Sequence, residues 1–165
     1  MLDIQTIGVI VTATSVTIAA AYYILSLHNQ NQTRQAQLFM NLYNSTTDKE
    51  FLRHVMEHTL KWNYSGFDDF EERYGLESNP EENTYWHLEA NFIESTAILV
   101  NRGLVPVSLV DAWVGDWFIA HWEKFSPYIR EFRVRNKLPG VWMENEALIK
   151  KLKEYRRKNP SRLPP

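Results

Sequence analysis

Two histidines and a glutamate in the first half of the chain have the spacing of a metal-binding helix. The segment His54-Val-Met-Glu57-His58 matches the H-x-x-E-H pattern of inverted zinc proteases. On a helix, His54 and His58 lie one turn apart, so both rings can bind one metal ion while Glu57 acts as a general base. A metal-dependent hydrolase is therefore one interpretation of this segment.

That interpretation needs a third protein ligand, because a catalytic zinc ion usually has three. The candidates lie in the next long helix: His87, Glu89 and Glu94. The alternative is a solvated helix face, since His54, Glu57 and His58 fall on one side with Lys61 and apolar residues take the other. Zinc proteases with this pattern are large mixed α/β enzymes. We therefore favour the solvated face and expect no metal and no cofactor.

Other catalytic signatures do not occur in the sequence. It contains no cysteine, which excludes disulfides, thiol catalysis and iron–sulfur clusters. It contains no G-x-S-x-G, Walker A or G-x-G-x-x-G pattern. A two-metal carboxylate site in a helical bundle needs Glu-x-x-His pairs, and the chain has none. We therefore expect that the protein is not an enzyme.

The N-terminal segment has the composition of a membrane span. No Asp, Glu, Lys or Arg occurs between Ile4 and Thr33, and 15 of the 21 residues from Ile7 to Leu27 are apolar. Twenty-one residues of helix extend about 31 Å, close to the ~30 Å of a hydrocarbon core. We predict a membrane anchor over residues 1–33, with a transmembrane helix over about residues 4–28, placing the protein in the cell membrane with a single pass.

Small residues recur along this span at helical spacing. They are Gly8, Thr12, Ala13, Thr17 and Ala21. Such faces let two helix backbones approach closely, so these residues are candidates for association within the membrane.

The charges on either side of the span predict its orientation. Arg34 follows the span and is itself followed by Lys49 and Arg53, whereas only Asp3 precedes it. The excess of positive charge predicts a cytoplasmic C-terminal domain.

The remainder of the chain is predicted to be helical. Caps, prolines and glycines delimit segments with helical periodicity, and no stretch alternates with period two. The expected helices cover residues 35–43, 47–60, 67–74, 80–102, 108–124, 126–137 and 142–158. We predict an all-α fold in which one transmembrane helix is followed by a small helical bundle, with a helical domain over 34–158 and a flexible tail over 159–165.

An aromatic stripe and a segregated charge distribution complete the pattern. Trp113, Trp117 and His121 recur every four residues, which predicts a bundle core that contains His121 as a hydrogen-bonded histidine. Residues 34–100 hold 12 acidic and 5 basic residues, whereas residues 147–165 hold 7 basic and 1 acidic residue. The basic end is expected to be solvated, or to pair with anionic lipid or the acidic half. The formal net charge of −2 argues against a nucleic-acid partner.

Several spaced residues resemble a known family. They are Asn91-Phe92-Ile93-Glu94, the bend Gly103-Leu104, Trp122-Glu123 with Pro127, and Trp142 with Glu144 and Leu148. This set is similar to a bacterial and archaeal family, domain of unknown function number 4760. The resemblance implies an N-terminal span and a small helical domain, and it implies no activity.

The motif residues also have a physical interpretation. A charge in a helical core needs a partner, so we predict that Asn91 and Glu94 join a buried network with Arg130 or Arg133. The sequence as a whole favours a membrane-anchored interaction or scaffold module that binds the lipid bilayer and a protein partner or a second copy. An accessory subunit of a larger membrane complex is the first alternative, and a metal-dependent hydrolase is the second.

Overall fold

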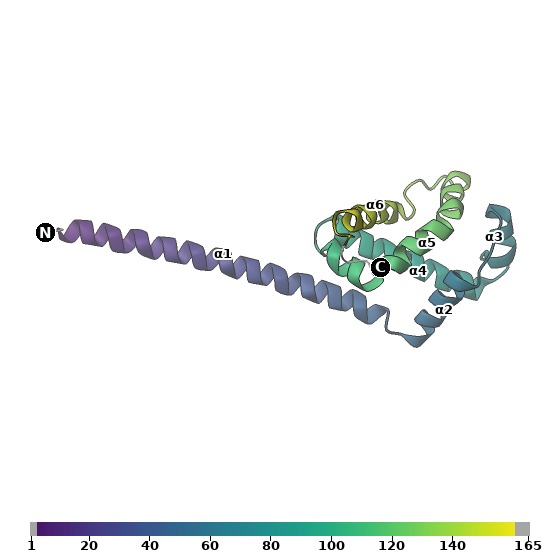
Figure 1. The fold of residues 1–165 in the computed structure, drawn as a ribbon, viewed down its shortest axis with the longest axis horizontal. Coiled ribbons are helices and arrows are strands. Elements are labelled where there is room, and N and C mark those ends of the chain that lie inside the picture. The colour runs from purple at the N-terminus through teal and green to yellow at the C-terminus, as the bar shows by residue number, and fades with distance from the viewer. Residues whose placement is uncertain (1–2, 161–165) are drawn as a thin grey trace. The chain divides into compact units, whose positions relative to one another are not determined.

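The computed structural model describes residues 3–160, and within them the chain forms six α-helices and no strand. The helices are α1 (Ile4–Ser45), α2 (Lys49–Leu60), α3 (Phe67–Tyr74), α4 (Pro80–Asn101), α5 (Val107–Arg135) and α6 (Met143–Lys158) (Figure 1). The predicted all-α fold is confirmed. Most of the predicted flexible tail, residues 161–165, lies outside the described residues. The chain divides into two units, Met1–Gln37 and Leu38–Pro165.

The first unit is the greater part of α1. This helix has 42 residues, which corresponds to about 63 Å. Its most apolar 18-residue window has a mean hydropathy of 1.8, and none of that window is buried. Among the described helices it alone is long and apolar enough to cross a membrane, a test that an N-terminal signal sequence also passes. The Asp3 carboxylate accepts a hydrogen bond from the Thr6 backbone N–H at 2.7 Å and caps the helix.

Polar side chains in the apolar part of α1 are satisfied within the helix. The hydroxyls of Thr12 and Thr17 donate to the carbonyls of Gly8 and Ala13, each at 2.9 Å. Those of Thr14 and Ser15 donate in the same way to carbonyls four residues earlier, at 2.8 Å. These bonds satisfy the four hydroxyl hydrogens within the helix, so this part of the segment is compatible with an apolar surrounding.

The second unit is an aromatic-rich bundle in which α2, α3 and α6 pack against α4 and α5. Its centre contains Phe70, Trp86, Phe118 and Phe125, which are all fully buried. Phe70 packs on Tyr128 from α5 with the ring centroids 3.9 Å apart. The end of α1 belongs to this unit, where Leu42 is buried. Of the predicted stripe, only His121 is buried in this core, whereas Trp113 and Trp117 are partly buried and pack against it. His121 was predicted to be hydrogen-bonded, but its Nε2 has no hydrogen-bond partner among the described residues.

The longest helix of the bundle differs from its prediction. The sequence predicts separate helices over residues 108–124 and 126–137, because Ser126-Pro127 resembles a helix start. Instead α5 continues through Pro127. The missing N–H of this proline leaves the carbonyl of Glu123 without its helical partner, and Glu123 is exposed, so water can serve instead. Phe125 and Ile129 are both fully buried on either side, and their packing favours one continuous helix over two.

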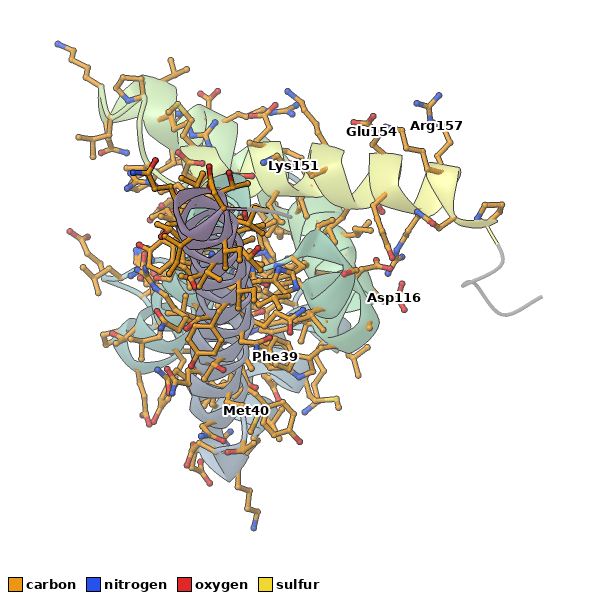
Figure 2. All side chains as sticks on the ribbon, turned by 90° about the vertical axis from the view of Figure 1, so that its left-hand side faces the viewer. Phe39, Met40, Asp116, Lys151, Glu154 and Arg157 are labelled. Atoms are coloured by element: carbon orange, nitrogen blue, oxygen red, sulfur yellow. The ribbon has the colours of Figure 1, made fainter. Side chains whose placement is uncertain are left out.

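The basic helix α6 has two distinct sides. Leu148, Ile149 and Leu152 are buried in the bundle. Figure 2 shows the labelled side chains of Lys151, Glu154 and Arg157 along the length of α6, and all three are exposed. Further ion pairs tie α6 to α5: Arg156 with Asp111 and Asp116, and Lys153 with Glu123. The basic end thus pairs with α5, which lies outside the acidic half at residues 34–100.

Candidate functional site

The two histidines of the H-x-x-E-H segment are buried, so the predicted solvated face is wrong. His54 retains 2% of its exposure and His58 none. The first turn of α2 is set by Asp48, whose carboxylate accepts the N–H of Phe51 at 2.9 Å. From this start α2 turns both histidines toward α4.

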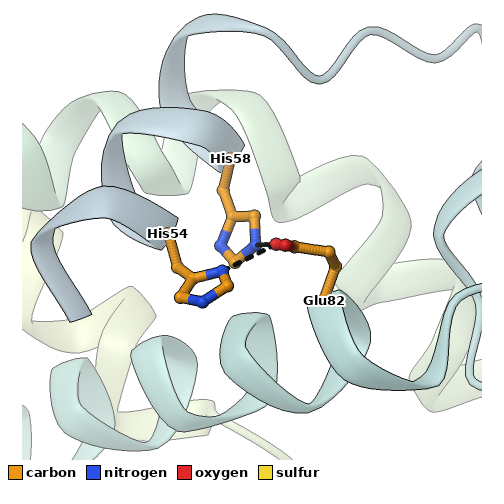
Figure 3. Close-up of side chains that lie close together, drawn as sticks. All are labelled: His54, His58 and Glu82. Carbon is orange, nitrogen blue, oxygen red and sulfur yellow. Dashed lines mark hydrogen bonds and ion pairs between the residues drawn. The ribbon is translucent and has the colours of Figure 1, made fainter. Parts of the chain in front are cut away.

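A carboxylate from the first turn of α4 lies between the two rings. The Oε2 atom of Glu82 is 2.8 Å from His54 Nδ1 and 3.2 Å from His58 Nε2 (Figure 3). Glu82 is 24% exposed, so the cluster reaches the surface at this residue. Burial raises the pKa of Glu82, but the hydrogen bonds from His54 and His58 outweigh burial and hold that pKa below its usual value.

A second carboxylate lies on the other side of His58. The Oε2 atom of Glu89 is 2.8 Å from His58 Nδ1, and Glu89 retains only 1% of its exposure. Its other oxygen, Oε1, accepts the indole N–H of Trp117 at 3.1 Å. The same oxygen lies 3.6 Å from Nε2 of the buried His121, which is too long for a hydrogen bond. Burial lowers the pKa of His121, although the charge of Glu89 opposes this shift.

The contacts of this cluster fix some of its donor and acceptor roles. Arg53 donates to His54 Nε2 at 2.7 Å, so His54 Nδ1 is the nitrogen that can donate to Glu82. Both nitrogens of His58 face carboxylate oxygens, but a neutral imidazole has only one N–H. A neutral His58 can therefore donate to only one of the two carboxylates.

The side chains that could hold a metal ion differ from the predicted ligand set. The ligand atoms of His54, His58 and Glu82 lie within 4.8 Å of one another, and two imidazole nitrogens with one carboxylate are ordinary zinc donors. Glu57, the predicted base, is not in this group; its carboxylate pairs with Lys61 at 2.7 Å. Of the three candidates for a further ligand, Glu89 contacts His58 through Nδ1, while His87 and Glu94 are not in the group.

The sequence alone does not identify Glu82 as part of this cluster, because its role depends on which face of α4 meets α2. The signal available in the sequence is the seven-residue interval between Glu82 and Glu89, which places both carboxylates on one side of a helix. The histidines of α2 repeat every four residues, so the two patterns can face each other. Neither pattern specifies its partner helix.

The predicted pairing of Glu94 with an arginine is wrong. The two oxygens of Glu94 accept the backbone N–H groups of Glu144 and Asn145 at 3.1 and 2.9 Å, at the start of α6. Neither Arg130 nor Arg133 forms an ion pair with Glu94 among the described residues. The positive N-terminal end of α6 satisfies the carboxylate instead.

The other residues of that network bind the same end of α6. The Asn91 side-chain oxygen accepts the indole N–H of Trp142 at 2.9 Å. Arg133 donates to the carbonyls of Val141 and Trp142 at 2.7 and 2.9 Å, and Arg130 lies 3.5 Å from Glu146 on the surface. Burial raises the pKa of Glu94, and the two backbone N–H groups oppose that shift. Asn91, Glu94 and Arg133 thus hold the loop before α6 and the first turn of that helix.

Two apolar surfaces lie outside these polar clusters. On α2, Leu52, Met56 and Leu60 are spaced four residues apart and are 46%, 60% and 71% exposed. On α1, the small residues predicted for association, from Gly8 to Ala21, are all exposed. Contiguous exposed apolar residues are typical of interaction surfaces.

The sequence was compared with known proteins. A family model described as "Domain of unknown function (DUF4760)" matches residues 9–152. This match extends from the apolar part of α1 to α6 and includes both polar clusters. No curated protein and no solved structure matches the chain.

Proposed function

We propose, on the premise that this chain belongs to the DUF4760 family, that it is a single-pass membrane protein whose helical domain binds a protein partner. The observation that carries this proposal is the exposed, uncharged helix at the N-terminus. Its most apolar window has a mean hydropathy of 1.8 and is not covered by any part of the chain. An exposed 18-residue window of this hydropathy is unfavourable in water, whereas a bilayer supplies the apolar surrounding.

The interaction surface that we assign to the domain is the outer face of α2. Leu52, Met56 and Leu60 form a continuous stripe along the helix, and their exposure leaves apolar area that a partner helix can cover. The histidines on the opposite side fix this orientation, because they are buried against α4. The stripe therefore points away from the bundle.

The proposed orientation places the helical domain in the cytoplasm. Arg34 follows the apolar stretch with Lys49 and Arg53 further along, whereas Asp3 precedes it. Because the sequence has no cysteine, single cysteines can be introduced without background. We expect Lys150→Cys to react with a membrane-impermeant maleimide only after the cells are lysed, and Asp3→Cys to react on intact cells. The reverse pattern would show a domain outside the cytoplasm.

Photo-crosslinking in native membranes tests the interaction. We expect a photoreactive residue at Met56 to crosslink to a protein, and the same residue at Asp116, which is 92% exposed on α5, to give no product. A product of twice the chain mass indicates a second copy, and any other mass indicates a different subunit. Equal yields at both positions would contradict a contact through α2.

An accessory subunit of a membrane complex is the second candidate, and the α1 surface favours it. The exposed small residues permit close helix approach, and the hydroxyls of Thr12 and Thr17 are bonded within the helix. Replacing Ala13 and Thr17 with leucine blocks such an approach while retaining the span. Loss of copurifying membrane proteins in this variant, with α2 crosslinks unchanged, would support docking through the span.

A further inference from the structure

We propose that His54, His58 and Glu82 form a binding site for a divalent transition-metal ion of the zinc class, with Glu89 as the outer partner of His58. The site joins α2 to α4 and does not include Glu57. This metal site is separate from the proposed protein interaction, because it is formed only by side chains of α2 and α4 that face each other. The H-x-x-E-H pattern suggested a different arrangement, in which Glu57 faced the metal.

The spacing of the ligand atoms fits such an ion. Glu82 Oε2 lies 2.8 Å from His54 Nδ1 and 3.2 Å from His58 Nε2, and the three ligand atoms lie within 4.8 Å of one another. Ligands at 2.0–2.1 Å around a tetrahedral zinc ion are about 3.3 Å apart. Small side-chain movements are therefore enough to admit the ion.

Glu89 supplies the feature that distinguishes a metal site from a simple salt bridge. A histidine that binds metal through one nitrogen usually donates the N–H of the other to a carboxylate. His58 has this arrangement, with Nε2 at the ligand cluster and Nδ1 2.8 Å from the buried Glu89. The indole of Trp117 bonds the other oxygen of Glu89 at 3.1 Å and fixes its orientation.

The contacts of His58 match the donor and acceptor roles of a metal ligand. With a cation at Glu82, His58 ligates through its Nε2 lone pair and donates its one N–H, on Nδ1, to Glu89. Both ring nitrogens then have partners.

Arg53 is the group that opposes the ion. Its Nη2 donates to His54 Nε2, which must carry the ring proton once Nδ1 binds metal. The Arg53 side chain is 52% exposed, so it can turn into solvent. Removing this cation should strengthen metal binding, which a purely structural role of the cluster would not predict.

Three protein ligands leave the fourth tetrahedral position to water, as in zinc sites with an open coordination position. Glu82 is the most exposed of the three ligands, at 24%, so solvent reaches the site from its side. The ion therefore belongs to a partly open site rather than to a closed structural one.

The test uses the full chain in detergent, stripped with a chelator and titrated with zinc sulfate. We expect one zinc ion per chain in the wild type. Glu82→Gln should weaken binding by more than the ~10–100-fold that loss of an outer partner costs, and Glu89→Gln by about that amount. Arg53→Ala should bind more tightly. Glu57→Gln is the matched control, because it removes a carboxylate that lies outside the site on α2, the helix of the two histidines.

A second measurement uses only the wild-type chain. Cobalt(II) bound to the wild-type chain should give the intense visible absorption of a tetrahedral site, which zinc then abolishes by displacement. Circular dichroism of each variant establishes that it is folded. Absence of saturable zinc binding to the wild type, or equal affinity in wild type, Glu82→Gln and Glu57→Gln, would overturn the proposal.

Discussion

The two ends of α4 hold their neighbouring helices by different means. Near its start, Glu82 and Glu89 bond the imidazoles of α2, so both sides of the contact can gain or lose protons. Near its end, Glu94 bonds backbone N–H groups at the start of α6, which do not titrate. The same residue type thus contacts imidazole side chains at one end of α4 and caps a helix through backbone N–H groups at the other.

The difference follows from what each carboxylate meets. Glu89 retains 1% of its exposure and faces two histidines and a tryptophan. A buried charge of this kind is tolerated only while its partners remain. Glu94 meets the positive end of a helix, where an acidic group satisfies N–H groups that have no partner within the helix. Four substitutions or changes of condition test this contrast, beginning with the largest expected effect.

Glu89→Ala should be the most destabilising change. It leaves His58 and Trp117 without their buried acceptor, and removing one partner of a buried pair costs about 3–5 kcal/mol. Denaturant unfolding in detergent, followed by tryptophan fluorescence, measures this loss, since all six tryptophans lie in the second unit. A loss below about 1 kcal/mol would show that the cluster does not hold α2 on α4.

Glu94→Ala should have a smaller effect. It removes the acceptor for the N–H groups of Glu144 and Asn145, and loss of a helix cap costs about 0.5–2 kcal/mol. Hydrogen exchange should show the first turn of α6 losing protection while α2 is unchanged. Glu94→Gln keeps one acceptor oxygen and is the matched control, with an intermediate effect. Loss of protection in α2 instead would contradict separate roles for the two ends.

Lowering the pH should weaken the bundle through His121. Burial holds the pKa of His121 below its usual 6.5, against the opposing charge of Glu89, while His58 and Lys124 reinforce the shift. The unfolded chain therefore binds a proton at His121 below pH 6.5 that the folded chain does not, so stability is full above that pH and falls below it. Thermal unfolding between pH 7.5 and 5.5 should show a shallower decrease in His121→Gln. Identical slopes would contradict a neutral His121.

Glu57→Gln should have the smallest effect. Glu57 pairs only with the exposed Lys61 on the same helix, and such pairs contribute about 0.3–0.5 kcal/mol. The free energy of unfolding should therefore change by no more than about 0.5 kcal/mol. A loss as large as that of Glu89→Ala would return Glu57 to the cluster and restore the H-x-x-E-H interpretation.

The sequence predicts more of the fold than of the polar site between α2 and α4. The uncharged N-terminal segment and the helical periodicity after it specify one long apolar helix and an aromatic bundle, because both patterns are local. The continuity of α5 could not be predicted, since the burial of Phe125 and Ile129 outweighs the local signal of Pro127. Packing against residues that are distant in the sequence therefore determines that α5 is one continuous helix.

The polar clusters show the same limit. The spacing places His54 and His58 on one face of a helix, but it favours a solvated face, because nothing local reveals that α4 covers them. The predicted network of Asn91 and Glu94 with an arginine does not form: Asn91, Glu94 and Arg133 each bond the segment at the start of α6 instead of one another. The predicted partner was wrong, because the backbone of α6 leaves no signature in side-chain identity.

The most direct test of the account is the state of the His58 ring in the metal-free protein. In the chain labelled with ¹⁵N-histidine, long-range proton–nitrogen spectra report each ring nitrogen, with His54→Gln and the exposed His28 as aids to assignment. We predict that the Nδ1–H of His58, 2.8 Å from Glu89, exchanges slowly with solvent, and that zinc shifts the Nε2 resonance to that of a metal-bound nitrogen. A His58 ring that exchanges as rapidly as that of the exposed His28, or that zinc leaves unchanged, would contradict the site between Glu82 and Glu89.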